Sequence, residues 1–290
     1  MLPTMKRKRV HGLTIAIVGA GKLGTALAIS LRAKGFEVAE IVSRDRKNSR
    51  LRGKKLARRV GAHAKVLGKE SLRANLIWLC VPDGEIAPCA KLLAATTVRG
   101  TIILHSSGAL TSDELSPLRK SGAHVASLHP MMTFVSGTVP SLEGVGFAVE
   151  GDREAVRAAM AVVRRLGGES FQIAMKDKAL YHAWGTFVSP LVTSLLASSE
   201  QVARAAGISR EMARRWTLPI ARQTIENYAK QGAARGFSGP IIRGDAATIR
   251  KHLTVLRRVP MAREVYIALA RSALRTLPTR KMKELKALLD

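Results

Sequence analysis

A glycine motif that directly follows an apolar stretch near the start of the chain constrains the fold most. Residues 13–18 have the pattern of a short strand, residues 22–34 that of a helix, and between them lies Gly19-Ala20-Gly21-Lys22-Leu23-Gly24. In this setting the first glycine permits a tight turn, the second lets backbone amides approach a pyrophosphate, and the third lets the helix pack closely on the strand. The positive end of the helix dipole favours phosphate there. The motif therefore predicts dinucleotide binding by residues 19–24, and the alternative is a purely structural turn.

The end of the next strand, expected over residues 37–42, indicates which dinucleotide is bound. An NAD site places an acidic residue at this point, where it binds the ribose 2′-hydroxyl. This chain has Ser43 and Arg44 instead. A guanidinium makes bidentate, charge-assisted hydrogen bonds to a phosphate, so the two residues favour the 2′-phosphate of NADP(H). Asp45 is the alternative: a register shifted by two residues would make it the ribose ligand.

Short apolar runs alternate with amphipathic stretches through the rest of the first half. Further strands are expected over residues 76–81, 101–104, 124–128, 146–149 and 171–174, and helices over residues 47–60, 112–120 and 153–166. Such alternation is typical of βαβ units around a parallel sheet. We therefore predict an α/β, doubly wound, dinucleotide-binding domain over residues 10–174.

The pattern changes near residue 175 and becomes helical to the end. Residues 177–206 are expected to form one long helix that Pro190 kinks. Gly207 ends it, and Ser209 can cap the next helix, which extends to residue 230. Helices are also expected over residues 245–257, 261–275 and 279–289. Residues 175–290 are therefore predicted to form an all-α domain for substrate binding and dimerisation.

The chain is strongly basic, with a formal net charge of +27 and a pI near 11.2. Nine of the 17 residues from 43 to 59 are basic, and such a field attracts anions. A generally basic, solvated surface explains this charge, and nucleic-acid binding through residues 47–59 is the alternative. Aromatic residues make up only 4%, which offers no stacking platform for single strands. We therefore expect no nucleic-acid partner.

Cysteine content and hydropathy indicate where the protein works. Cys80 and Cys89 are the only cysteines, and neither falls at metal-ligand spacing, so no metal site and a reducing, cytoplasmic setting are expected. Residues 5–9 and 13–20 resemble the basic and apolar parts of a signal peptide, but the apolar run is short and leads into the glycine motif. Residues 183–198 carry no charge but number only 16, whereas a membrane span needs about 20 residues. No membrane association is expected.

Six motifs in order make the sequence resemble a known group. They are GAGKLG (19–24), CVPD (80–83), HSSG (105–108), LHPMMTF (128–134), KALYHA (178–183) and SGPIIRGD (238–245). With these motifs the chain resembles an uncharacterised bacterial family in which a Rossmann-like NADP-binding domain precedes a helical domain of unknown function. More distantly, it is similar to pyrroline-5-carboxylate reductase, ketopantoate reductase and 6-phosphogluconate dehydrogenase.

The resemblance implies a Rossmann-like sheet, an NADP cofactor, a C-terminal domain like that of 6-phosphogluconate dehydrogenase, and a homodimer formed through the helical half. One position departs from the family pattern. Relatives usually carry Ser-Asn in the middle of the long helix, whereas this chain has Ser189-Pro190. The side-chain amide is lost, which puts a family-wide role of that position in doubt.

Polar motifs follow several predicted strands, at the sheet edge where doubly wound folds bind ligands. Val81 and Pro82 are expected to line the nicotinamide side of the cofactor; alternatively, Pro82 forms a turn and Asp83 caps the next helix. Ser106 and Ser107 offer hydroxyls to a substrate carbonyl or carboxylate, or else serve as a cap or loop. The neighbouring His105 and the strand-end His129 are candidate substrate contacts, and for His129 a hydrogen-bonded structural role is the alternative.

The long helix predicted over residues 177–206 carries a more specific set of candidate catalytic residues. Lys178, His182, Gly185 and Ser189 follow one another at spacings of four, three and four, which places them on one helical face. In 6-phosphogluconate dehydrogenases a Lys is followed four residues later by an Asn, and Lys178 and His182 resemble that pair by position. Reduction of a carbonyl or imine needs a proton, which a desolvated Lys178 could donate and His182 could relay. The alternatives are a solvated Lys178 and a His182 that packs between domains.

Two further residues complete the predicted site. Ser189 on the helix and Arg243 in the GPIIRGD turn are candidate substrate ligands, and Arg243 could instead tie its loop to a partner subunit. Asp245 is expected to cap the following helix. The sequence thus predicts an NADP(H)-dependent oxidoreductase acting on a small carbonyl, imine or hydroxy-acid substrate in an interdomain cleft. The alternative is an NADP-binding sensor or scaffold without turnover.

Overall fold

A computed structural model describes residues 12–290, and the chain divides after Thr186 into two compact units. The basic segment at residues 5–9 lies outside the described residues. Most of the helix that opens the predicted second domain belongs to the first unit, because that helix begins at Lys178. The two units are described separately below.

The first unit is built on one eight-stranded sheet with the strand order β3-β2-β1-β4-β5-β6-β7-β8. The order reverses between β1 and β4, which is the switch point of a doubly wound fold. The predicted α/β, Rossmann-like class is therefore confirmed. The strands are β1 (Thr14–Val18), β2 (Glu37–Ser43), β3 (His63–Val66), β4 (Leu76–Leu79), β5 (Ile102–His105), β6 (His124–Pro130), β7 (Gly146–Gly151) and β8 (Glu169–Gln172).

The sheet departs from the expected parallel arrangement at one step. Strand β7 runs antiparallel to β6, and β8 is again parallel to β7. Residues 131–145, which connect β6 to β7, contain no helix. A parallel neighbour needs a crossover, whereas a loop is enough to return the chain antiparallel. The edge strand β3 was also not expected; it is short and half-exposed.

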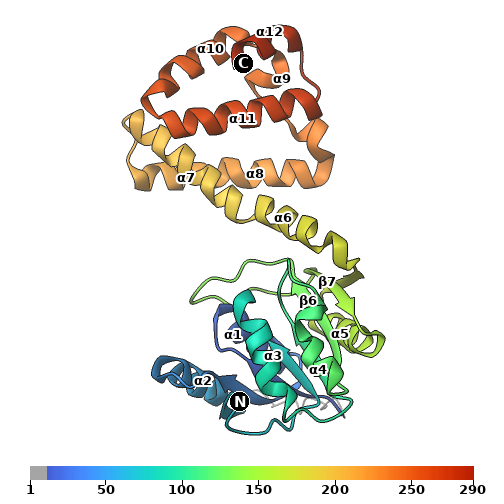
Figure 1. Cartoon of the computed structure of the whole chain (residues 1–290). Helices are drawn as coiled ribbons and strands as arrows, with labels where there is room; N and C mark the ends of the chain where they lie inside the picture. The colour runs from blue at the N-terminus through green and yellow to red at the C-terminus, as the bar shows by residue number, and fades with distance from the viewer. Residues whose placement is uncertain (1–11) are drawn as a thin grey trace, which may run out of the picture. The chain divides into compact units, whose positions relative to one another are not determined.

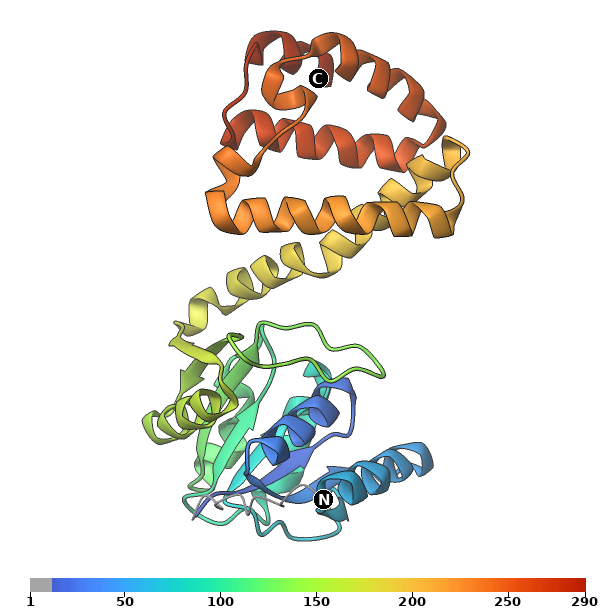
Figure 2. The same ribbon diagram turned by 180° about the vertical axis from the view of Figure 1, so that it is seen from behind.

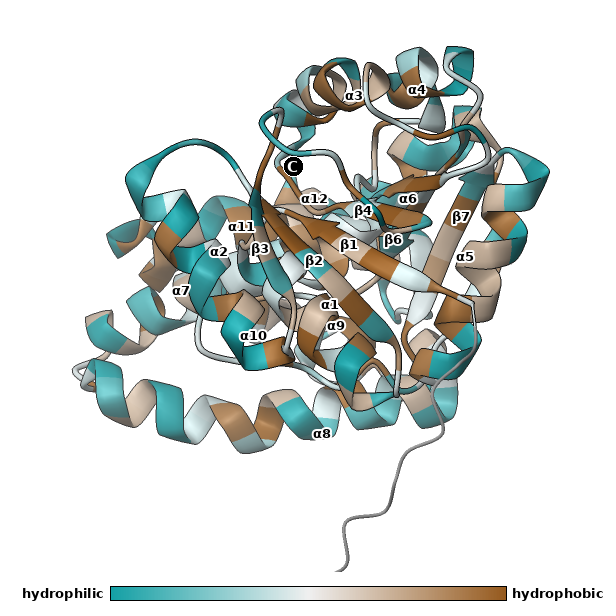
Figure 3. Ribbon diagram, turned by 90° about the horizontal axis from the view of Figure 1, so that it is seen from below, coloured by the Kyte–Doolittle hydropathy of each residue, from teal (hydrophilic) through white to brown (hydrophobic). Residues whose placement is uncertain are grey.

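Helices cover both faces of the sheet. One face carries α1 (Lys22–Ala33), α2 (Lys47–Val60) and α5 (Arg153–Leu166), and the other carries α3 (Ile86–Ala94) and α4 (Ser116–Lys120) (Figures 1 and 2). Successive strand residues alternate between the faces, so Ile15 and Ile17 join one buried cluster while Ala16 and Val18 join the other. The central strands are hydrophobic along most of their length, as a sheet covered on both sides requires, whereas the edge strands β3 and β8 are polar and partly exposed (Figure 3).

The second unit is all-helical, as predicted. Its elements, with the helix that leads into it, are α6 (Lys178–Val188), α7 (Pro190–Ala205), α8 (Arg210–Gly236), α9 (Pro240–Arg243), α10 (Ala246–Val255), α11 (Pro260–Thr276) and α12 (Met282–Leu289). The expected kink at Pro190 is a full interruption, because Ser189 adopts φ −128° and ψ −80° between α6 and α7. Within residues 12–290, every helix is too short or too polar to cross a lipid bilayer.

Both predicted helix caps are confirmed. The Ser209 hydroxyl accepts a hydrogen bond from the backbone N–H of Met212 at 3.2 Å, and an Asp245 carboxylate oxygen accepts one from that of Thr248 at 3.0 Å. Each satisfies an amide that the first helical turn leaves unpaired. Helix α8 continues beyond the predicted end at residue 230 to Gly236, with a kink at Gly232, which adopts a φ of 75°.

Candidate functional site

The glycine turn between β1 and α1 has the steric form that the motif predicts. Gly19 adopts a φ of 107°, and a Cβ there would lie 2.6 Å from the carbonyl oxygen of Cys80. A Cβ on Gly24 would lie 1.9 Å from the carbonyl oxygen of Gly19, whereas one on Gly21 would meet nothing within 4 Å. Two glycines are thus required by packing, and the third leaves open space at the N-terminus of α1. That space fits the approach of a phosphate group to the backbone.

A pocket of about 220 Å³ lies beside this turn, at the carboxyl ends of β1, β2 and β4. Its lining includes the predicted cofactor residues Gly19, Ala20, Gly21, Ser43, Arg44, Val81 and Pro82. The other three, Lys22, Leu23 and Gly24, form the first turn of α1 and do not line the pocket.

Two polar residues of the pocket were missed by the sequence reasoning. Ser49 and Arg52, from α2, also line it. Their spacing of three residues on a predicted helix that follows Arg44 was the available signal, because such residues share a helical face. They add a hydroxyl and a second guanidinium to the pocket wall.

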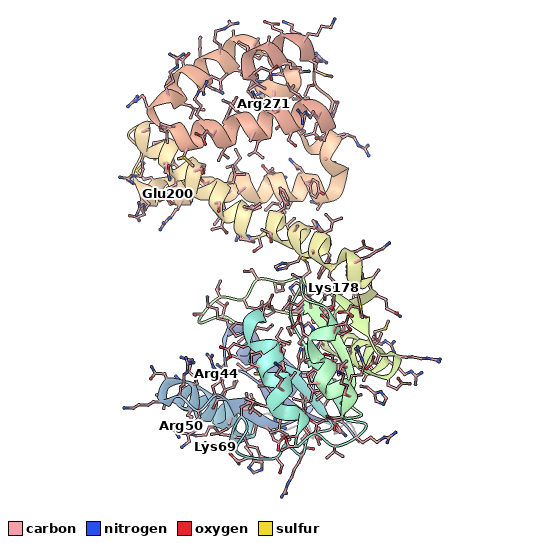
Figure 4. All side chains as sticks on the ribbon, in the orientation of Figure 1. Arg44, Arg50, Lys69, Lys178, Glu200 and Arg271 are labelled. Atoms are coloured by element: carbon pink, nitrogen blue, oxygen red, sulfur yellow. The ribbon has the colours of Figure 1, made fainter. Side chains whose placement is uncertain are left out.

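Charged side chains gather where β2 leads into α2 (Figure 4). Arg44 donates from Nη1 to Oε1 of Glu85 at 2.6 Å. Asp45 pairs with Lys69 at 2.5 Å and with Arg50 at 3.2 Å. These cations, Lys69 foremost, hold the pKa of Asp45 below its usual value. Asp45, the alternative ribose ligand, does not line the pocket.

His105 at the end of β5 is buried, and both of its ring nitrogens take part in hydrogen bonds. Its Nδ1 accepts the backbone N–H of Ser107 at 3.1 Å, so Nε2 carries the proton and donates to the carbonyl of Thr111 at 3.0 Å. Burial is the main cause that lowers its pKa to about 4. The neutral ring thus fixes the loop after β5 and has no nitrogen left for a substrate.

The two serines after His105 also have partners. The hydroxyl of Ser106 accepts a hydrogen bond from the indole N–H of Trp78 at 2.7 Å. The hydroxyl of Ser107 donates to Asp83 at 2.9 Å and accepts the backbone N–H of Leu110 at 2.9 Å. Asp83 is thereby tied to the loop after β5, a contact the sequence did not indicate.

Lys178, the first residue of α6, is completely buried. Its Nζ donates to the hydroxyl of Ser127 at 2.6 Å and to the carbonyl of Ser107 at 3.3 Å, and it lies 3.6 Å from Glu150. Glu150 also accepts both the backbone N–H and the hydroxyl of Ser112, each at 2.8 Å. Burial lowers the pKa of Lys178, while Glu150 opposes that shift. The ammonium at the start of α6 therefore links this helix to the loop after β5, to β6 and to β7.

Two histidines and a tyrosine meet beside Gly108. Nδ1 of His129 lies 3.0 Å from the hydroxyl of Tyr181, and the His129 and His182 rings meet edge to face at 5.7 Å. A Cβ on Gly108 would lie 2.5 Å from His182 and 3.0 Å from Nε2 of His129, so a larger residue there would force the His182 ring to move. Burial, then His182, Lys178 and His105, lower the pKa of His129 to about 4. His182, in contrast, is exposed.

The remaining predicted residues lie in the second unit. Ser189 separates α6 from α7, and its carbonyl accepts hydrogen bonds from the backbone N–H and the hydroxyl of Thr193. Arg243 ends the short helix α9 and is exposed. The structure thus brings together the predicted residues of the first unit in two places, the pocket at the glycine turn and the cluster around Gly108.

Two family models match the chain, one in each half. A model for a Rossmann-like domain matches residues 3–130, and a model for a domain of unknown function (DUF2520) matches residues 145–273. No curated protein matches the sequence.

Several solved structures share the fold over nearly the whole chain. A candidate NADP oxidoreductase from Bacteroides fragilis, BF3122, is 21% identical, with a TM-score of 0.75 over 90% of this chain and 97% of that chain. Protein TM1727 from Thermotoga maritima is 21% identical, with a TM-score of 0.69 over 95% and 98%. An imine reductase from Pseudomonas sp. is 18% identical, with a TM-score of 0.65 over 97% and 100%.

These matches agree with the predicted resemblance, and identities this low establish the fold alone. The chain thus combines a segment that matches the Rossmann-like model with a segment that matches the model for the domain of unknown function DUF2520, and it has a doubly wound sheet followed by helices.

Proposed function

We propose that the protein is an NADP(H)-dependent oxidoreductase that acts on a small carbonyl, imine or hydroxy-acid substrate. The observation that carries the proposal is the pocket beside the glycine turn, where open space at Gly21 adjoins Ser43, Arg44, Ser49 and Arg52. Helix N-termini and backbone amides bind phosphates, and guanidinium groups bind them bidentately. The solved structures of similar fold support this proposal, because they include an imine reductase from Myxococcus stipitatus in complex with NADP+.

The choice of NADP(H) over NAD(H) rests on the charge around β2. Two guanidinium groups line the pocket, and the carboxylate that could bind a ribose hydroxyl, Asp45, is paired with Lys69 and Arg50. A 2′-phosphate would meet cations at this wall, whereas a bare ribose would find no free acidic partner in Asp45.

A bound nicotinamide cofactor would supply or accept a hydride, which leaves the protein's own groups to handle the proton. His182 is the exposed titratable side chain beside Gly108, so we assign it the proton transfer. The low pKa of His129 keeps its ring neutral at neutral pH, and we assign it to hydrogen bonding with the substrate. Lys178 is enclosed, so it would act by holding the Ser107–Gly108 turn, and Ser106 and Ser107 would shape that turn.

Two measurements test the proposal. Titration with NADP+ and NAD+ should give tighter binding of NADP+, and a panel of keto acids and cyclic imines should include one that is reduced as NADPH is consumed. His182→Gln should lower kcat by at least about 100-fold, the lower end of the usual contribution of a positioned acid or base, and the matched control His63→Gln on exposed β3 should not change it. Binding of NADP+ without turnover on any substrate would favour the sensor or scaffold alternative. Failure to bind either nucleotide would refute the proposal.

We also propose that the protein forms a homodimer through its helical half. Within the second unit, large apolar side chains are exposed along α7 and α8, among them Leu191, Leu195, Trp216, Ile220 and Ile225. An exposed apolar surface of this extent is typical of a protein interface. An apolar pocket of about 450 Å³ within the second unit, lined in part by Leu195, Val202 and Leu269, is a further surface that a second copy could cover.

Sedimentation analysis tests the dimer. The wild-type protein should sediment as a dimer at micromolar concentration, and Trp216→Glu with Ile220→Glu should convert it to a monomer, because a buried charge without a partner is costly. A matched control, Arg58→Glu with Lys55→Glu on the exposed side of α2, should leave the dimer intact. A monomeric wild type would contradict the proposal.

The proposed cytoplasmic location rests on the nicotinamide chemistry and on the buried free thiols of Cys80 and Cys89.

A further inference from the structure

An ion pair lies at the edge of the pocket beside the glycine turn, with Arg44 in the pocket lining and Glu85 outside it. Arg44 follows β2, and Glu85 lies in the short 3-10 turn (Asp83–Glu85) after β4. In the sheet, β1 lies between β2 and β4, so a contact between the two residues passes over the carboxyl end of β1, where the glycine turn begins. The two side chains meet at 2.6 Å. The pair therefore lies beside the site that the proposed function assigns to the cofactor.

Arg44 has two competing uses in this arrangement. Its side chain lines the pocket, yet its Nη1 already donates to the carboxylate of Glu85. Among the described residues, the nearby carboxylate of Asp45 is already held by Lys69 and Arg50. Glu85 is therefore the carboxylate that is paired with a guanidinium of the pocket wall.

We infer that Glu85 sets the cofactor selectivity by competing with the 2′-phosphate for Arg44, an inference that rests on the proposed nucleotide site. A nucleotide without a 2′-phosphate can bind while the Arg44–Glu85 pair stays in place. One with a 2′-phosphate must take the guanidinium from the carboxylate, and it can do so because a phosphate carries more negative charge than a carboxylate and has three acceptor oxygens. Glu85 thus reduces the advantage that Arg44 gives to NADP(H).

The exposure of the pair bounds the size of this effect. Both side chains are 37% exposed, so water screens their attraction and the pair is easily exchanged. Exposed ion pairs typically contribute an amount that corresponds to a change in affinity of about two- to five-fold. Glu85 is therefore expected to tune the selectivity and not to reverse it.

Calorimetric titration with 2′,5′-ADP and 5′-AMP isolates the adenosine end of the pocket. Glu85→Gln should bind 2′,5′-ADP about two- to five-fold more tightly than the wild type and should bind 5′-AMP equally well. The matched control is Glu143→Gln, which removes one negative charge from another exposed ion pair, with Lys34 at 3.2 Å, outside the pocket lining. It should leave both affinities unchanged. Unchanged or weaker binding of 2′,5′-ADP by Glu85→Gln would overturn the inference.

A double-mutant cycle separates competition for Arg44 from a general loss of negative charge. Arg44→Gln should weaken the binding of 2′,5′-ADP, and adding Glu85→Gln to it should give no gain, because the contested cation is gone. A gain that persists in the Arg44→Gln background would overturn the inference and leave the proposed function intact. If the wild type binds neither probe nor NADP+, the proposed function fails and this inference fails with it.

Discussion

The two units of the molecule differ in how completely each buries its own apolar surface. In the first unit, two clusters of buried hydrophobic residues fill both faces of the sheet. In the second, one small cluster is formed by Ala246, Ile249, Leu253, Ala270, Leu274, Leu285 and Leu289. Helix α7 has no buried residue and α8 has only Ala213. The first unit therefore has the core of an independent domain, whereas the second is expected to gain much of its stability by covering its exposed helices.

The units also differ in the polar and charged side chains that they bury. Lys178 and Glu150 are both buried in the first unit, and the polar groups around them are hydrogen-bonded. Such a network is costly when one member is removed, because the remaining charge keeps its desolvation penalty. The predictions below test whether the stability of the first unit depends on these polar ties as well as on its core.

The largest effect is expected for Lys178→Met. Loss of the ammonium leaves Glu150 buried without its charged partner, which should lower the free energy of unfolding by about 3–5 kcal/mol. Chemical denaturation followed by circular dichroism measures the change. The neighbouring exposed Lys176→Met is the control and should be nearly neutral. Adding Glu150→Gln should restore part of the loss, and a Lys178→Met protein as stable as the control would show that the ion pair is dispensable.

The second-largest effect is expected on acidification, which should lower the free energy of unfolding of the first unit. The buried ring of His105 and the half-buried ring of His129 have pKa values lowered to about 4, from 6.5 when unfolded. Between these values the unfolded chain binds protons that the folded chain excludes, so the stability present above pH 6.5 is lost as the pH falls toward 4. The loss is up to about 3 kcal/mol for each histidine. Denaturation curves at a series of pH values should show it. His105→Gln should flatten the slope across this window, and an unchanged slope would contradict the assigned cause.

The smallest effect is expected in the second unit. Asp245 caps α10 through both carboxylate oxygens, which accept from the backbone N–H and the hydroxyl of Thr248. Asp245→Ala should cost about 1 kcal/mol, the usual contribution of a helix cap. Thermal unfolding measures the loss, with Glu264→Ala on an exposed helix position as the control. If Asp245→Ala cost as much as Lys178→Met, the contrast between the units would not hold.

Local patterns predicted much of this structure, because their physical causes lie within a few residues. The glycine turn follows from a spacing of two and three residues, and the caps at Ser209 and Asp245 act on amides three residues away. The Rossmann-like class follows from strands that alternate with helices.

Contacts between residues that are far apart in the sequence could not be predicted from local patterns. Lys178 reaches Ser127 across 51 positions and Glu85 reaches Arg44 across 41, and no local periodicity encodes either pair. Lys178 was expected at a substrate cleft because its helical face was known, but the strands that enclose it were not. The reversal of β7 was missed because it depends on the connection after Pro130 having no helix.

The pairing of Asp45 with Lys69 and Arg50 has a consequence for redesign. Replacing Arg44 alone would remove one cation of the proposed NADP(H) pocket but would leave the Asp45 carboxylate paired with Lys69 and Arg50. A variant designed to bind NADH would also need substitutions at Lys69 and Arg50, so that the carboxylate is free to bind a ribose hydroxyl.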